Sequence, residues 1–142
     1  MDTITQAPDN WPTWPHIYNT GERAKSAAVL ARIEASECTE ILDRAENEAK
    51  EASTPNATGY QPDRVTFRIM EAMRAARAKA LISATEATEA AEAAAQAKTN
   101  AIARNLEYTA HRHHRAATEY RRACQSLFIA ARDVSNATNP TP

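Results

Sequence analysis

The stretch AKSAAVLARIEASECTEILDRAENEAKEA (residues 24–52) decides the fold, because small side chains recur along it every three or four residues. This spacing places them on one side of an α-helix, and acidic residues occupy the opposite side. The repeated positions form a seam of seven alanines, one cysteine and one leucine: Ala24, Ala28, Ala31, Ala35, Cys38, Leu42, Ala45, Ala49 and Ala52. Such a seam lets a neighbouring helix approach more closely than a leucine seam would.

Glycine and proline indicate where the helices end. All nine of these residues lie outside residues 22–54 and 63–139: Pro8, Pro12, Pro15, Gly21, Pro55, Gly59, Pro62, Pro140 and Pro142. The two uninterrupted blocks are rich in Ala, Glu, Arg and Lys, which are strong helix formers. We therefore expect nearly the whole chain to be α-helix, with a turn-rich connection over residues 54–62.

The second block contains two seams that are displaced from each other by one residue. The first seam is Ile69, Met73, Ala76, Ala80, Ser83, Ala87, Ala90, Ala94, Ala97 and Ala101. The second is Ile102, Leu106, Thr109, His113, Ala116, Tyr120, Ala123, Leu127, Ala130 and Val134. A break near Lys98-Thr99-Asn100 explains the displacement and leaves three helices of similar length, at about residues 22–53, 63–98 and 100–134. We expect an antiparallel three-helix bundle; the alternative is a two-helix hairpin with one very long helix, dimerised.

The helical domain, residues 21–135, is flanked by an arm over residues 1–20 and a tail over residues 136–142. The arm contains both tryptophans, Trp11 and Trp14, and ends near Tyr18 and Thr20, where Thr20 is a candidate N-cap. Its prolines keep the arm extended. It either folds back over one end of the bundle or docks on a partner, since aromatic rings supply contact area at low entropic cost.

The composition indicates a thin core. The 142 residues include 32 alanines but only 18 Leu, Ile, Val and Phe together, and the net charge is −1. A buried methyl group contributes about 0.8 kcal/mol, against about 1.5–3 kcal/mol for a large aliphatic side chain. A homo-oligomer, most simply a dimer, would compensate for this. The chain has neither a signal-peptide pattern nor a membrane-spanning apolar run, so we expect a cytoplasmic protein without membrane association.

The last helix contains many arginines and no lysine between residues 104 and 132. Arginine favours planar contacts to carboxylate or phosphate. The face comprises Arg104, His111, Arg115 and Arg122, and is widened by Arg112, His114, Arg121 and Arg132. It is either a polar surface neutralised by the acidic face of the first helix, or a contact surface for an anionic partner.

The sequence offers little for metal binding or catalysis. Glu107, His111 and His114 share a helix, but their spacing matches neither a zinc nor a di-iron pattern. The two cysteines, Cys38 and Cys124, lie near apolar seams and are expected to be buried thiols. No phosphate-binding glycine loop or nucleophile motif occurs, so we expect no cofactor, no metal and no enzymatic activity.

These observations predict a non-enzymatic protein–protein interaction module, such as an inhibitor, adaptor or assembly factor. One alternative is a nucleic-acid-associated protein that uses the arginine face on phosphates; another is a structural component that polymerises through alanine seams. The candidate partner-binding residues lie in the arm and on the last helix: Trp11, Trp14, Tyr18, Arg104, His111, Arg112, Arg115, Arg121 and Arg122.

Overall fold

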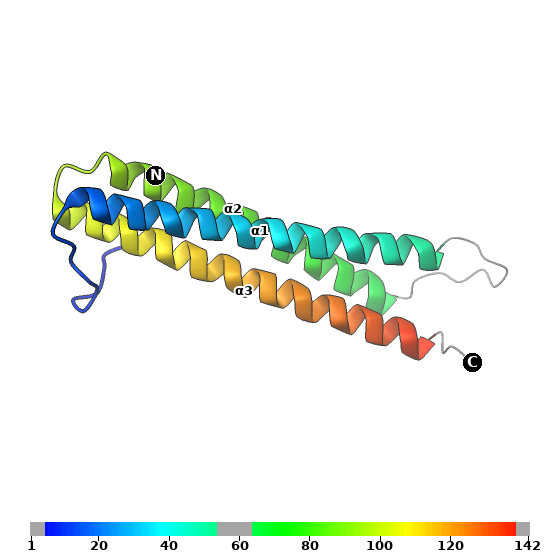
Figure 1. Cartoon of the computed structure of the whole chain (residues 1–142). Helices are drawn as coiled ribbons and strands as arrows, with labels where there is room; N and C mark the ends of the chain where they lie inside the picture. The colour runs from blue at the N-terminus through cyan, green and yellow to red at the C-terminus, as the bar shows by residue number, and fades with distance from the viewer. Residues whose placement is uncertain (1–4, 54–63, 139–142) are drawn as a thin grey trace.

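Three long helices pack side by side in the computed structural model, which describes residues 5–53 and 64–138 (Figure 1). They are α1 (Ile17–Ser53), α2 (Arg64–Ala95) and α3 (Asn100–Thr138), and each packs against the other two. Helices α1 and α3 run in one direction and α2 in the other. The all-α three-helix bundle is therefore confirmed. The expected connection over residues 54–62 lies outside the described residues.

Helix α1 begins at Ile17, five residues before the expected start, so the N-cap assignment of Thr20 is wrong. The carbonyl of His16 accepts hydrogen bonds from the amides of Asn19 and Thr20, and Thr20 is buried inside the helix. Gly21 lies inside the helix and faces α2: a Cβ at this position would be 3.6 Å from the Cα of Ala95, an ordinary van der Waals distance. This glycine is therefore part of a helix and not of a turn.

The chain leaves α2 after Ala95 and enters α3 at Asn100, so the single long helix of the alternative reading does not form. The amides of Gln96 and Ala97 bond carbonyls three residues back, which tightens the last turn of α2. Thr99 then caps α3, because its hydroxyl oxygen accepts a hydrogen bond from the amide of Ile102 at 3.2 Å. The second helix thus ends three residues earlier than expected, and α3 extends four residues beyond its expected end.

The core is built largely from alanine. The predicted seam of α1 is buried from Ala24 to Ala45, and the predicted seam of α2 is buried from Met73 to Ala94. The seam predicted for α3 is rotated from the observed one, since Ile102 and Ala123 are exposed. The buried residues of α3 are Ala103, Leu106, Glu107, Thr109, Ala110, Ala117, Cys124 and Phe128. Its small side chains, which allow the closest approach of two neighbouring helices, lie at the centre of the buried stripe.

No helix in the described part of the chain has an apolar stretch that is long enough to span a bilayer.

Candidate functional site

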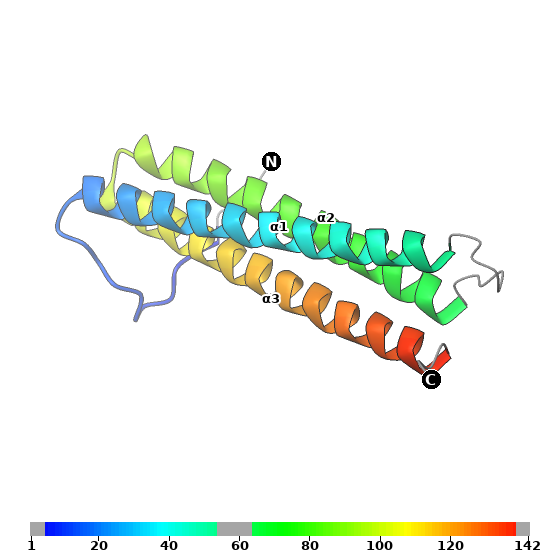
Figure 2. The ribbon, with the colours of Figure 1, turned by 45° about the vertical axis from the view of Figure 1, so that its right-hand side comes forward.

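The arm leaves the start of α1 and returns to lie against α3 (Figure 2). Polar side chains of α3 hold its backbone: the amide of Ala7 donates to Asn105 Oδ1 at 2.9 Å, and the amide of Thr5 donates to Thr109 Oγ1 at 3.2 Å. Arg104 donates to the carbonyl of Trp11, with its Nη2 at 2.6 Å. The arm therefore covers the end of the bundle where α1 and α3 begin.

The two tryptophans of the arm lie against different helices. The ring of Trp11 meets Tyr108 edge-on, with centroids 5.0 Å apart, and lies 5.4 Å from the ring of His111. The guanidinium of Arg23 lies 4.2 Å from the centre of the Trp14 ring. Four of the nine candidate partner-binding residues (Trp11, Trp14, Arg104 and His111) are thus brought together within the chain.

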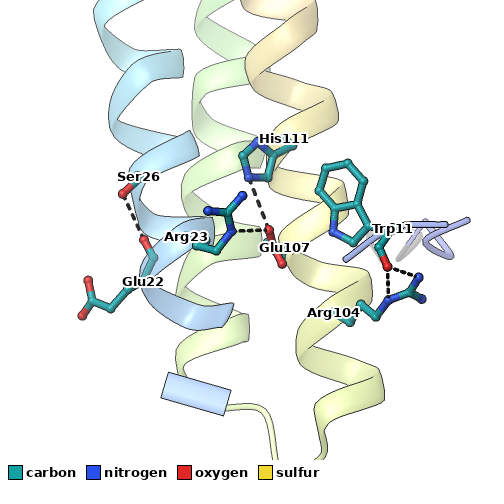
Figure 3. A network of polar contacts seen from close by, with 7 residues as sticks. All are labelled: Trp11, Glu22, Arg23, Ser26, Arg104, Glu107 and His111. Carbon is teal, nitrogen blue, oxygen red and sulfur yellow. Dashed lines mark hydrogen bonds and ion pairs between the residues drawn. The ribbon is translucent and has the colours of Figure 1, made fainter. Parts of the chain in front are cut away.

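A buried carboxylate, Glu107, lies beneath the arm (Figure 3). Its Oε2 accepts a hydrogen bond from Arg23 Nε at 3.1 Å, and His111 Nε2 lies 3.5 Å from the same oxygen. Burial alone would raise the pKa of Glu107, but the interactions with His111 and Arg23 lower it by more, so its net pKa is below the ordinary value. Glu107 is therefore an ionised side chain in the core that depends on Arg23 for its charge balance.

Sequence reasoning considered Glu107 only as a metal-ligand candidate beside His111 and His114, and did not single out Arg23. A signal for Glu107 exists, since it lies three or four residues from Ala103 and Ala110, on the side of the small residues. Nothing local to Arg23 indicates its role, because its partner lies 84 residues further along the chain.

Besides Arg104, which binds the arm, two arginines of α3 bind acidic side chains of α1. Arg121 contacts both Glu34 and Glu37, and Arg132 Nη2 lies 2.9 Å from an oxygen of Glu48. The acidic face of α1 thus neutralises part of the arginine face of α3, as one of the two readings of the sequence anticipated.

The remaining arginines of that face are more exposed. Arg112 lies near the ring of Tyr108 and reaches Thr5 at 3.5 Å. Arg115 and Arg122 are exposed and form no ion pair with any described residue. Only these two of the candidate arginines have a guanidinium without a partner in the described part of the chain.

A groove runs along the boundary between α1 and α2. It consists of two hollows of about 660 and 530 Å³, which share Arg32, Thr88 and Glu92. Small residues of both helices form its floor: Gly21, Ala28, Ala35, Ala84, Ala91 and Ala95. Because these side chains are short, the groove is open although the helices pack closely.

Exposed apolar side chains lie beside this groove. Tyr18 at one end is 73% exposed and Leu81 at the other is 43% exposed, and both line it. Val29 and Ile33 are also exposed and lie one turn apart on α1. They do not line the groove, but they lie one turn from Arg32 and Ser36, respectively, which do. We call the groove with these four side chains the α1/α2 face. Of the four, sequence reasoning had singled out only Tyr18.

The cysteines form a buried pair in the core. The thiol of Cys124 donates to the carbonyl of Cys38 at 3.8 Å, and neither side chain is exposed. Burial raises the pKa of Cys124 to about 12. The expectation of buried thiols is therefore confirmed, and both stay protonated at neutral pH.

The histidines of α3 occupy different surroundings. His113 Nδ1 lies 3.2 Å from an oxygen of Glu86, in a hollow of about 780 Å³ between α2 and α3. Burial lowers the pKa of His114, so this residue adds no charge to the arginine face at neutral pH. Among the described residues, no three His, Cys, Asp or Glu side chains converge as a metal site would require.

Comparison of this chain with protein-family models, with curated proteins and with solved structures finds no match.

Proposed function

We propose that this protein is a non-enzymatic interaction module, which binds another protein through the α1/α2 face. The observation that carries this proposal is the row of exposed apolar side chains beside an alanine-floored groove. Single exposed apolar residues are common on protein surfaces, whereas a contiguous patch marks an interaction site. Inhibitor, adaptor and assembly-factor roles all use a surface of this kind.

The chemistry of the face suits a helical partner. Short side chains on the floor allow a partner helix to approach closely, and the apolar side chains on the rim close around it. Tyr18, Val29, Ile33 and Leu81 are each exposed by 40 to 73%. Burying the exposed portions contributes on the order of 3–6 kcal/mol before the costs of association. This gain suits a reversible complex.

The arginines give less support to the nucleic-acid alternative. Arg104 binds carbonyl oxygens of the arm, and Arg121 binds acidic side chains of α1. Of the candidate arginines of α3, only Arg115 and Arg122 have no partner among the described residues, and two guanidinium groups are a small footprint for phosphate binding. We therefore favour a protein partner.

The test compares two arginine substitutions at exposed apolar positions. Leu81→Arg places a charge on the α1/α2 face, and Ile129→Arg is the matched control, because Ile129 is 52% exposed on α3. Each immobilised protein is used to capture partners from the native host, with circular dichroism as the check on folding. We expect Leu81→Arg to lose the captured protein and Ile129→Arg to retain it. Equal capture by both variants would exclude the α1/α2 face.

A further inference from the structure

We infer that the protein bound by the α1/α2 face is a second copy of this chain, so that α1 and α2 of both copies form a four-helix interface. This inference rests on the proposed function, because it names the partner of the same surface. Three observations carry it: the charges along the groove, their distribution over the two helices, and the shape of the face.

Three of the charged side chains that line the groove form no ion pair within the described chain. Lys25 and Arg32 stand on the α1 wall and Glu92 on the α2 wall, and none of the three forms an ion pair with a described residue. Arginine–glutamate pairs bridge the helices elsewhere: Arg23–Glu107, Arg121–Glu34 and Arg132–Glu48 join α1 and α3, and Arg74–Glu46 joins α1 and α2 beyond the groove. The groove therefore offers charges of both signs to a partner.

The distribution of these charges makes the face complementary to itself. A two-fold axis parallel to the helices places α1 of one copy over α2 of the other at the same height. The basic α1 wall of each copy, where Lys25 and Arg32 outnumber Glu22, then faces the acidic α2 wall of the other, with Glu89 and Glu92. A two-fold axis perpendicular to the helices would instead place the two basic walls together. The sign of the charges thus selects the first arrangement.

The shape of the face supports the same arrangement. Ala28 and Ala91 leave room on the floor, and the exposed side chains of Val29, Ile33 and Leu81 project beside it. Four helices packed in this way bury apolar side chains in a shared core, as in a four-helix bundle. A chain whose own core consists mainly of alanine gains stability from such burial.

The first experiment measures self-association of the purified full chain by sedimentation velocity over a range of concentrations. We expect a concentration-dependent dimer. Leu81→Arg acts twice in a symmetric dimer and weakens it at least about 100-fold, because 1.4 kcal/mol per copy is tenfold. Ile129→Arg leaves the dimer unchanged. A wild-type chain that stays monomeric at the highest concentration would overturn the inference.

The second experiment exchanges the charges. Arg32→Glu alone and Glu92→Arg alone each create two like-charge contacts in the homodimer, so each weakens self-association. An equimolar mixture of the two variants restores opposite charges at both contacts and forms a mixed dimer, which native mass spectrometry distinguishes by mass. The double variant carrying both changes in one chain also associates again. Failure of the mixture to form a mixed dimer would refute this arrangement.

The two proposals fail in different ways. If the wild-type chain is monomeric but captures a different protein, and Leu81→Arg abolishes that capture, the homodimer is excluded and the interaction module stands. If Leu81→Arg changes neither self-association nor capture, both proposals are excluded.

Discussion

Replacing Arg23 by methionine tests how the buried carboxylate of Glu107 is tolerated. Arg23 Nε lies 3.1 Å from Glu107 Oε2, and the glutamate side chain is not exposed. Methionine keeps an apolar contact with Trp14 but removes the positive charge. The variant therefore leaves an ionised side chain in the core with only His111 beside it.

The expected loss follows from the burial of the two side chains. Removing one partner of a fully buried ion pair costs about 3–5 kcal/mol, because the remaining charge stays buried without compensation. The side chain of Arg23 is 44% exposed, so water screens part of this interaction. We expect Arg23→Met to lower the free energy of unfolding by about 2–3 kcal/mol at neutral pH.

Urea unfolding followed by circular dichroism measures this loss, and its pH dependence identifies the cause. The pKa of Glu107 is lowered in the folded protein, so its stabilising contribution is present above the ordinary carboxyl pKa of 4.5 and is lost as the pH falls through the folded value. Without Arg23 that contribution is smaller, because only His111 remains to lower the pKa of Glu107. The difference between the two proteins is therefore largest at neutral pH and shrinks in acid.

Arg74→Met is the matched control. Arg74 Nε also lies 3.1 Å from its glutamate, Glu46, and Arg74 is 48% exposed, but Glu46 is 39% exposed where Glu107 is not exposed at all. We expect Arg74→Met to cost less than about 1 kcal/mol. Equal losses for the two variants, or an Arg23→Met loss that persists unchanged in acid, would show that the buried charge of Glu107 does not cause the loss.

Four further predictions concern the backbone, the core and the arm. Gly21→Ala raises the free energy of unfolding by about 0.5–1 kcal/mol, since the added methyl group makes only ordinary contacts with α2 and alanine favours the helix; a lower melting temperature would contradict this. Cys38 and Cys124 react with a thiol reagent at mildly alkaline pH only as the protein unfolds, because both are buried and Cys124 has a pKa of about 12; rapid labelling of the folded protein would speak against it. The same raised pKa makes stability fall as the pH rises above the ordinary thiol value of 9.0, since the unfolded chain ionises first. Arg104→Ala releases the arm, so that acrylamide quenches the fluorescence of Trp11 more strongly while helicity is unchanged; unaltered quenching would mean that Arg104 does not hold the arm.

The architecture could be predicted because its signals are local. The spacing of alanines over residues 24–45 and 76–94 indicated which sides of the first two helices are buried, and the prolines indicated the end of α1 and the start of α2. The start of α1 could not be predicted in this way. Gly21 reads as a helix breaker in the sequence, yet it lies inside α1.

The rotation of α3 and the roles of its arginines depend on distant partners. Glu107 occupies the buried side of α3 because Arg23 reaches it from another helix. Arg104 and Arg121 resemble surface residues in the sequence, and their partners lie in the arm and on α1. Spacing within one helix contains no information about such contacts. Val29 and Ile33 did carry a signal, since two large aliphatic residues one turn apart lie off the seam.

Hydroxyl-radical footprinting of the wild-type chain, at low and at high concentration, tests most directly whether the α1/α2 face makes the contact. Radicals oxidise exposed side chains, so a contact lowers the labelling of the residues that it covers. We predict reduced labelling of Tyr18, Ile33 and Leu81 at high concentration, with Ile129 on α3 labelled equally at both. Unchanged labelling of all four side chains, or protection of Ile129 alone, would show that the α1/α2 face does not make the contact.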